Sequence, residues 1–211
     1  IVRDRAREVV QIRAQVMQSL RKTFTEDSFL EIETPMLQTI HGGASARPFK
    51  THSNAFDTEL FLRIAPELFL KRAVVGGIER VYEINRNFRN EGADRTHSPE
   101  FAMLEAYQAY GDYNTMASLT QKLIQNAAQD IFGTQQVELE DGTINDLSGD
   151  WQHISMFESL SKAAGEEITP ETPIEKLKKL AERVEIEIDH PQHGKYVEEL
   201  WEHFVKGDLV N

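Results

Sequence analysis

The segment FRNEGADRTHSPEFAMLEAY, residues 88–107, concentrates charged and aromatic residues in an order that core packing alone does not require. Residues 81–89 before and within it alternate in type, which is a strand pattern. Residues 100–107 also alternate, and at a period of two one face carries Phe101, Met103, Glu105 and Tyr107. Residues 90–99 are rich in loop formers. The sequence therefore predicts two antiparallel strands joined by a long loop, and such loops are often functional.

This strand pairing brings Arg89, at the end of the first strand, close to Phe101, at the start of the second. The planar fork of an arginine fits a phosphate or a carboxylate, and an exposed phenyl ring offers a face on which a purine stacks. Glu105 lies deeper on the same face and would accept from a cationic group. The alternative is structural, with a surface salt bridge from Arg89 to Glu91 and a core Phe101. The pattern favours an adenine nucleotide and an ammonium group.

The same segment resembles the second signature motif of class II aminoacyl-tRNA synthetases, and RNFRNEG, HSPEF and MLEAY resemble the lysyl enzymes in particular. Residues 29–35, FLEIETP, resemble the first motif. GGASARPF at 42–49 and RIAPELFLKR at 63–72 add to the match, although Ser98 stands where many lysyl enzymes have asparagine. The resemblance implies an α+β fold with the antiparallel-sheet core of class II synthetases.

For the nucleotide, the resemblance implies that Arg89 is the catalytic residue, which contacts the α-phosphate of ATP and the carboxylate under attack. Glu91 and His97 correspond to further ATP contacts, and Phe101 corresponds to the ring under adenine. The alternative for His97 is a loop-capping role. Mg²⁺ is expected to accompany ATP, with its ligands in a C-terminal part that this sequence does not contain.

For the amino acid, the resemblance implies that Glu67 and Glu105 hold the two amines of L-lysine, with Gly43 as a backbone contact and Tyr107 as a pocket hydroxyl. Glu67 opens a predicted helix, where the helix dipole favours a carboxylate whatever its function. The alternative for Gly43 is an ordinary loop position. A substrate without the second amine would leave a buried carboxylate unpaired, which is costly, and an aspartyl enzyme would carry cationic or amide groups at that position.

The N-terminal segment predicts an amphipathic helix over residues 2–24, followed by a strand over 29–33 that Pro35 ends. By resemblance to the first motif, this unit forms a homodimer interface. The alternative is that its apolar stripe is simply core, and that the arginines near its start form a solvated face.

Further along the chain, caps and periodicity predict other elements. They are a strand over 57–64, a helix from Pro66 to Gly76, a helix from Asp112 to Ile131 with Asp112 or Asn114 as its cap and Gly133 as its stop, a hairpin over 137–147, helices opening at Ser155 and Thr172, a strand over 184–188 and a helix over 195–206. We expect residues 1–150 to be the first part of a catalytic core and 151–211 to be a helical insertion region. His190 and His193 are expected in a solvated loop rather than in a metal site.

Composition excludes several classes of protein. The formal net charge of −12 argues against a chain that grips nucleic acid by itself. With no cysteine there is neither a disulfide frame nor a thiolate metal site, so a cytoplasmic location is expected. No apolar run approaches the length of a membrane span, and no membrane partner is expected.

Together these observations predict a fragment of a class II lysyl-tRNA synthetase that activates L-lysine with ATP and transfers it to tRNA(Lys). The third motif and the anticodon-binding barrel are not found, and no arginine follows Arg183, so the fragment alone is expected to be an incomplete catalyst. Three alternatives stay open. They are an enzyme of the same fold that transfers lysine to a protein or a lipid, an aspartyl-type synthetase, and a non-catalytic dimerisation or regulatory module.

Overall fold

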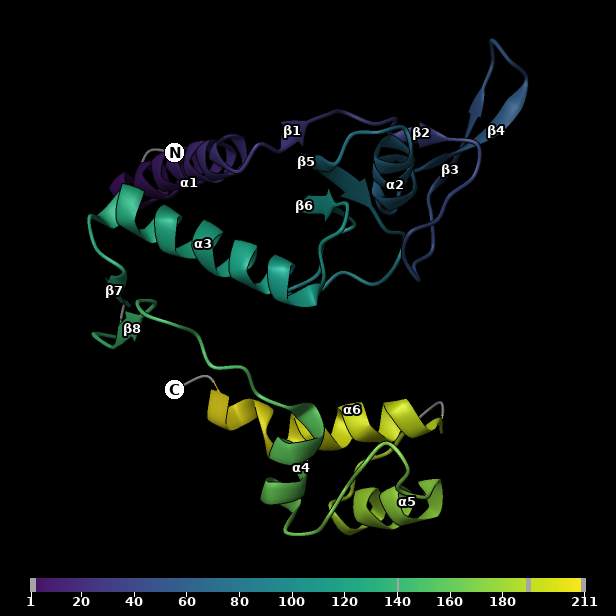
Figure 1. Cartoon of the computed structure of the whole chain (residues 1–211). Helices are drawn as coiled ribbons and strands as arrows, with labels where there is room; N and C mark the ends of the chain where they lie inside the picture. Colours follow the sequence, from purple (N-terminus) through teal and green to yellow (C-terminus); the bar gives the residue numbers. More distant parts are fainter. Residues whose placement is uncertain (1–2, 140, 189–190, 210–211) are drawn as a thin grey trace. The chain divides into compact units, whose positions relative to one another are not determined.

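The structure of the chain is a computed structural model that describes residues 3–139, 141–188 and 191–209 (Figure 1). Two compact units make up the chain, Ile1–Gly149 and Asp150–Asn211. The predicted α+β fold class is confirmed, because largely antiparallel sheets and packed helices make up the first unit.

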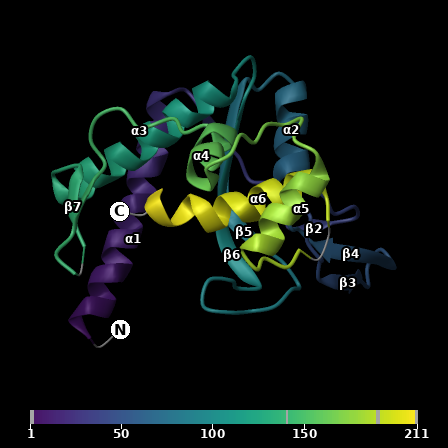
Figure 2. The same cartoon turned by 90° about the horizontal axis from the view of Figure 1, so that it is seen from below.

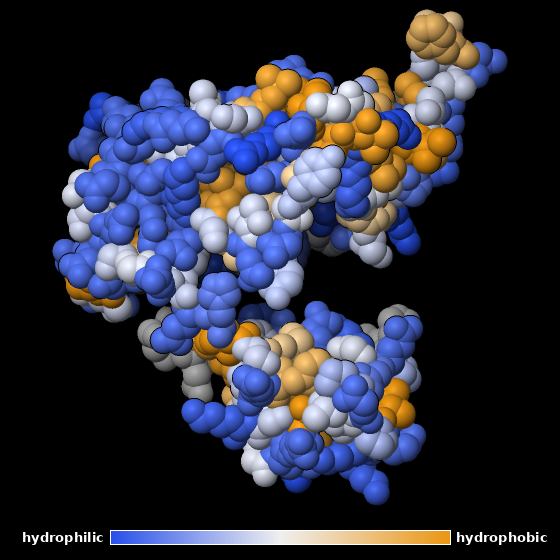
Figure 3. All heavy atoms as spheres, in the orientation of Figure 1, coloured by the Kyte–Doolittle hydropathy of each residue, from blue (hydrophilic) through white to orange (hydrophobic). Residues whose placement is uncertain are grey.

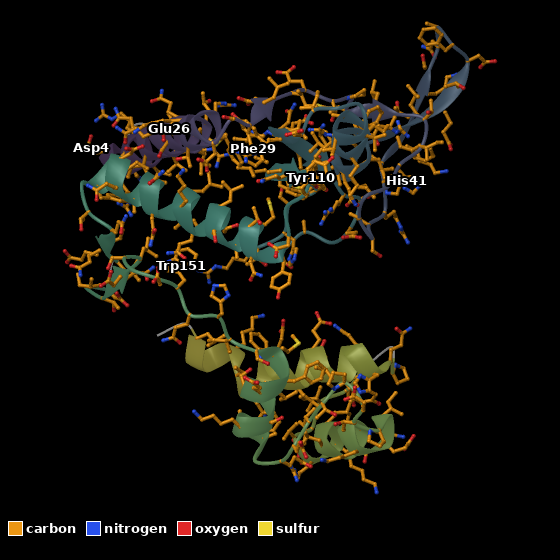
Figure 4. The ribbon with its side chains drawn as sticks, viewed as in Figure 1. Asp4, Glu26, Phe29, His41, Tyr110 and Trp151 are labelled. Carbon is orange, nitrogen blue, oxygen red and sulfur yellow. The ribbon has the colours of Figure 1, made fainter. Side chains whose placement is uncertain are left out.

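Two long helices, α1 (Asp4–Glu26) and α3 (Tyr113–Phe132), pack along each other in the first unit, as Figures 1 and 2 show. Helix α1 follows the predicted amphipathic segment with a shift of two residues, and Figure 4 labels its ends, Asp4 and Glu26. Helix α3 begins and ends as predicted: Asp112 accepts from the Thr115 amide at 2.8 Å, and Gly133 adopts a left-handed φ of 71°. Among the described residues, no helix is both long and apolar enough to cross a bilayer.

The main sheet has the strand order β1-β5-β6 and contains β1 (Leu30–Glu31), β5 (Arg80–Phe88) and β6 (Glu100–Gln108). Strands β5 and β6 are antiparallel, with Phe88 opposite Glu100, which confirms the predicted pair and its long connecting loop. Strand β1 runs parallel to β5 and is shorter than the predicted strand over 29–33.

A second sheet has the order β2-β4-β3 and contains β2 (Leu37–Gln38), β3 (Lys50–Ser53) and β4 (Thr58–Leu62). Strand β4 lies within the predicted strand over 57–64, whereas β2 and β3 were not predicted from the sequence. The turn between β3 and β4 carries Phe56, which is 83% exposed, and Figure 3 shows an apolar tip on this hairpin. Helix α2 (Glu67–Val75) follows β4 and packs on β5 and β6.

The core of the first unit lies between the helices and the main sheet. Its centre is an aromatic stack in which the Phe24 ring lies 4.1 Å from Tyr82 and 5.1 Å from Phe29, centroid to centroid. Figure 4 labels Phe29 just beyond the end of α1. Leu119 and Leu123 of α3 complete this cluster. Each buried large side chain contributes about 1.5–3 kcal/mol, so this cluster fixes β5 against both helices. A small hairpin of β7 (Gln136–Glu138) and β8 (Ile144–Asp146) follows α3, as predicted.

The second unit is helical, with α4 (Met156–Ala164), α5 (Ile174–Arg183), α6 (His193–Phe204) and the 3-10 turn η1 (Lys206–Leu209). These helices share a separate buried core that includes Leu160, Leu177 and Leu200. Ser155 accepts from the Glu158 amide at 3.4 Å and caps α4, as predicted.

Three local predictions in the second unit were wrong. Residues 184–188 do not form a strand, because Glu185 has a left-handed φ of 58° and the alternating apolar residues pack individually on the helical core. Thr172 does not cap α5, because its hydroxyl accepts from the Thr169 amide at 2.8 Å instead. His193 does not lie in a solvated loop, because it is the first residue of α6 and its ring lies 2.9 Å from the Thr172 carbonyl oxygen; His190 lies outside the described residues.

Candidate functional site

The end of the β5–β6 pair carries a cation stacked on an aromatic ring. The guanidinium carbon of Arg89 lies 5.1 Å from the centroid of Phe101, and the backbone N–H of Arg89 donates to the Pro99 carbonyl at 2.9 Å. The Arg89 Nε is buried and has no hydrogen-bond partner among the described residues. An unsatisfied buried donor is costly, and an anion that accepted a hydrogen bond from this nitrogen would remove that cost.

A cavity of about 270 Å³ opens beside this pair and is called the loop cavity here. Its lining residues are Arg89, Glu91, Gly92, Thr96, His97, Ser98 and Phe101. The four residues predicted to contact a nucleotide therefore lie around one cavity. Its volume is close to the lower limit of about 300 Å³ for typical ligand pockets.

Asp94 organises the connecting loop from within. Its carboxylate accepts from the Thr96 amide at 2.7 Å and from the His97 amide at 2.8 Å, and it lies 2.8 Å from the His97 Nδ1. These contacts, led by the Thr96 amide, hold the pKa of Asp94 well below its usual range. The imidazole is thus fixed through Nδ1, while His97 Nε2 has no hydrogen-bond partner among the described residues.

Hydrogen bonds join residues 42–49 to the same loop. The Asn90 amide donates to the Arg47 carbonyl at 2.7 Å, and the Arg47 amide donates to a Glu91 carboxylate oxygen at 3.3 Å. Among the described residues, Glu91 therefore does not form the alternative surface salt bridge with Arg89. Instead, the Glu91 side chain joins the loop that carries Gly43 to the loop that carries Arg89.

Gly43 lies directly against Glu67, the first residue of α2. A Cβ added to Gly43 would lie 2.7 Å from the Glu67 Cβ, and Gly43 has a left-handed φ of 87°. Both facts require glycine here, since any side chain would be strained and would push Glu67 away. Two of the four predicted lysine contacts, Gly43 and Glu67, are thus neighbours.

Glu105 lies in the middle of β6 and is half-buried, and its carboxylate accepts from the Tyr107 hydroxyl at 3.0 Å. Burial raises the pKa of Glu105 above its ordinary value, the Tyr107 hydrogen bond opposes this rise, and the negative charge of Glu67 adds to it. The pKa of Tyr107 is raised by burial and by the charges of Glu105 and Glu67. Three of the residues predicted to bind the amino acid, Glu67, Glu105 and Tyr107, therefore form one acidic group of side chains. The charges of both carboxylates raise the pKa of the tyrosine.

A buried ion pair that was not predicted from the sequence involves the strand next to Glu105. An Arg63 nitrogen lies 2.7 Å from a Glu83 carboxylate oxygen, and the two side chains are 0% and 2% exposed. Glu83 also accepts from the Thr34 hydroxyl at 2.6 Å, and it is the cross-strand partner of Glu105. The signal in the sequence was weak, an arginine inside the apolar run LFLRIAP.

Lys71 was missed as well. Its ammonium lies 2.5 Å from a Glu67 carboxylate oxygen and 5.7 Å from the centroid of the Tyr107 ring. The spacing of four residues between Glu67 and Lys71 on a predicted helix is the sequence signal that would have found this pair.

Comparisons with known proteins bear on the whole chain. The family model described as tRNA synthetases class II (D, K and N) matches residues 1–200. The lysine–tRNA ligase of Kineococcus radiotolerans is 65% identical over 211 residues, which cover 99% of this chain and 42% of that protein. The lysine–tRNA ligase of Mycolicibacterium gilvum is 60% identical over 213 residues, covering 100% of this chain and 42% of that protein.

A different relative is the lysylphosphatidylglycerol biosynthesis bifunctional protein LysX of Mycolicibacterium vanbaalenii. It is 48% identical over 206 residues, which cover 95% of this chain and 19% of that protein. The chain thus spans less than half the length of the curated relatives it matches. The family model covers nearly every residue, and the fold has the predicted strand pair and loop. The chain therefore belongs to the class II tRNA synthetase family (D, K and N).

Proposed function

We propose that this chain is the lysine- and ATP-binding part of a lysine–tRNA ligase, with residues 1–150 as the first part of the catalytic core and 151–211 as a helical insertion region. The relatives named lysine–tRNA ligase, at 53–65% identity, support this proposal. The observation that carries it is that one strand pair holds Glu105, which forms the acidic group with Glu67, and, at its end, the stacked pair of Arg89 and Phe101.

The charges of this group match those of L-lysine. Lysine has two ammonium groups and one carboxylate, and the site offers two carboxylates and one guanidinium for them. In this proposal Glu67 and Glu105 hold the two amines, Gly43 contributes a backbone contact and Tyr107 contributes its hydroxyl. Aspartate has a second negative charge in place of the second amine, so Glu105 would repel it.

The proposed nucleotide occupies the loop cavity, with adenine on the ring of Phe101 and further contacts from Glu91 and His97. The lysine carboxylate attacks the α-phosphorus of ATP, which forms lysyl-adenylate and releases pyrophosphate. The terminal ribose hydroxyl of tRNA(Lys) then takes the lysyl group, and AMP leaves. Arg89 acts by position and charge, because it can bind the α-phosphate and the attacking carboxylate together.

Three further parts of the proposal concern the metal ion, the oligomeric state and the location in the cell. Mg²⁺ would arrive on the ATP phosphates and neutralise their charge. We assign it no ligands here, because the described residues contain no group of three or more His, Cys, Asp or Glu side chains suited to a metal ion. A homodimer through α1 and β1 is proposed from the first motif, and partly exposed Val9 and Val10 of α1 support it. The proposed location is the cytoplasm, where tRNA is charged.

A second candidate function has support from the relative LysX, whose printed name includes lysylphosphatidylglycerol biosynthesis. A chain of this kind would form the same lysyl-adenylate and pass the lysyl group toward a lipid. The identity of 48% is lower than the 65% of the first relative, which favours the tRNA ligase. A non-catalytic module would lack lysine binding altogether.

Calorimetric titration of the chain with L-lysine, ornithine and aspartate, each with and without ATP and Mg²⁺, tests the proposal. We expect binding of L-lysine in preference to ornithine and no binding of aspartate. Arg89→Ala is expected to remove the effect of ATP, while the matched control Arg86→Ala, at an exposed arginine of the strand that ends just before Arg89, retains it. A folded chain that binds no lysine would refute the proposal and favour the non-catalytic module.

A further inference from the structure

Lys71 stands in front of the carboxylate that the proposed function assigns to the substrate. Its ammonium lies 2.5 Å from Glu67 Oε1, while the Glu67 side chain is 28% exposed. On its other side the same ammonium faces the Tyr107 ring at 5.7 Å. Lys71 therefore contacts two of the four proposed lysine-binding residues, from within the chain itself.

Counting charges shows that Lys71 is in surplus once a substrate is bound. The two substrate amines neutralise Glu67 and Glu105, and Arg89 neutralises the substrate carboxylate. No negative group of the described site is then left for the Lys71 ammonium. In the empty site, by contrast, the charge of Glu67 repels that of Glu105 and contributes to the raised pKa of Glu105. The positive charge of Lys71 beside Glu67 lowers this repulsion.

Lys71 is also free to leave. Its side chain is 56% exposed, and its four-carbon stem is flexible. Ion pairs of this kind, four residues apart on a helix surface, contribute little to stability. An incoming ammonium held at several points can therefore replace it.

We propose that Lys71 is an internal competitor for the amino-acid site: its ammonium occupies Glu67 in the empty pocket, and the α-ammonium of the substrate displaces it. This inference rests on the proposed function. It adds a specificity-determining residue, because a ligand must supply an ammonium at Glu67 that is better held than the ammonium of Lys71.

Lys71→Met tests this by removing the competing charge while keeping the length of the stem. In calorimetric titration we expect the Kd for L-lysine to fall about two- to fivefold, which is the range for a half-exposed ion pair. The Kd for 6-aminohexanoate, which lacks an α-ammonium, should not change. Lys71→Arg keeps the charge and should not tighten the binding of lysine.

Lys50→Met is a closely matched control. The Lys50 ammonium lies 3.2 Å from a Glu59 oxygen and 5.4 Å from the Phe61 centroid, so it makes the same two kinds of contact away from the site. We expect no change in either Kd. A gain in affinity for lysine alone cannot come from partial unfolding, which would weaken the binding of every ligand.

The possible outcomes are distinct. If wild type binds lysine and Lys71→Met binds it equally or more weakly, Lys71 is not a competitor and the inference fails while the proposed function stands. An equal gain for lysine and 6-aminohexanoate also overturns it, because the effect would then be general electrostatics. If neither wild type nor Lys71→Met binds lysine, the proposed function fails and the inference fails with it.

Discussion

Replacing Glu105 with glutamine should make the free protein more stable and at the same time weaken its binding of lysine. Glutamine has the same shape as glutamate. In the wild-type chain the Tyr107 hydroxyl donates to the Glu105 carboxylate at 3.0 Å, and the carbonyl oxygen of glutamine can accept the same hydrogen bond. The substitution thus removes a charge and keeps the packing. Charge is what separates a ligand-binding role of Glu105 from a purely structural one.

The expected gain in stability comes from a half-buried charge with little compensation. Among the described residues, the Tyr107 hydroxyl is the group that donates to the Glu105 side chain, and Glu67 adds repulsion. Removing an incompletely satisfied charge of this kind is expected to gain about 1 kcal/mol, at the lower end of the desolvation cost. For a protein of this size that corresponds to a rise in Tm of about 2–4 °C.

The gain should depend on pH with a definite sign. The folded-state pKa of Glu105 is raised above its ordinary value of 4.5, so the folded chain binds the proton more tightly than the unfolded chain. The stability that Glu105 contributes is therefore fully present below its unfolded pKa and is lost as the pH rises through the folded pKa. Glu105→Gln should match wild type near about pH 4 and exceed it in Tm near about pH 8.

The loss of affinity follows from the hydrogen bond between a charged acceptor and the substrate ammonium. A hydrogen bond to a charged group contributes about 1.5–3 kcal/mol, which corresponds to a rise in Kd of about ten- to a hundredfold. Calorimetry with L-lysine and thermal melts at the two pH values measure both effects on one preparation.

Glu100→Gln is the matched control, since Glu100 is on the same strand and forms an exposed ion pair with Arg86 at 3.7 Å. Its expected changes in Tm and in Kd are within error. A lowered Tm of Glu105→Gln at both pH values, together with an unchanged Kd for lysine, would refute the reasoning. Such a result would show that Glu105 is a structural residue whose charge is well satisfied.

Other substitutions test the parts around this group. Arg63→Met should destabilise the first unit by about 3–5 kcal/mol because it leaves Glu83 buried and unpaired, and a chemical denaturation curve that shows a smaller loss when Glu83→Gln is added would support this cause. Gly43→Ala should cost about 1–2 kcal/mol and weaken lysine binding, since its new Cβ would meet the Glu67 Cβ at 2.7 Å; calorimetry with unchanged affinity would contradict this. Asp112→Ala should lower stability by about 1 kcal/mol through loss of the α3 cap, and an unchanged thermal melt would exclude that role.

The elements predicted well from sequence are those with local signals. Helix α3 carries its own beginning and end in Asp112 and Gly133, because a cap and a left-handed glycine act on neighbouring residues. Strands β5 and β6 are long enough for their alternation to be visible, and a single loop joins them, so their pairing follows from the chain order.

The elements that the sequence did not predict depend on distant partners. Strand β3 has the polar sequence KTHS, is largely exposed and exists because its backbone pairs with β4. Residues 184–188 show the opposite case, in which alternation has the appearance of a strand while the side chains pack on helices. Periodicity reports which residues are apolar, and the neighbouring elements decide what structure buries them.

The proximity of Arg89 and Phe101 was foreseeable because a strand pair fixes the distance between its ends. The ion pair of Arg63 and Glu83 was not, because it joins the end of β4 to the middle of β5 and no sequence spacing encodes that contact. Lys71 lies between these cases. Its spacing from Glu67 was visible, but its position against Tyr107 requires α2 to pack on β6.

The contrast between Glu83 and Glu105 gives the strongest physical argument for where a ligand binds. Both are glutamates of the main sheet, and they lie directly opposite each other in the register of β5 and β6. Their surroundings can therefore be compared directly. Glu83 has its charge met by Arg63 and further donors in Thr34 and Asn85, whereas the described contacts of Glu105 offer one neutral hydroxyl. Among the described residues Glu105 has no ion-pair partner, and the charge of Arg63 does not offset the effect of burial, since the pKa of Glu105 stays raised. A diamine can supply an ammonium at Glu105, and on this ground we propose that this strand sets the specificity for lysine.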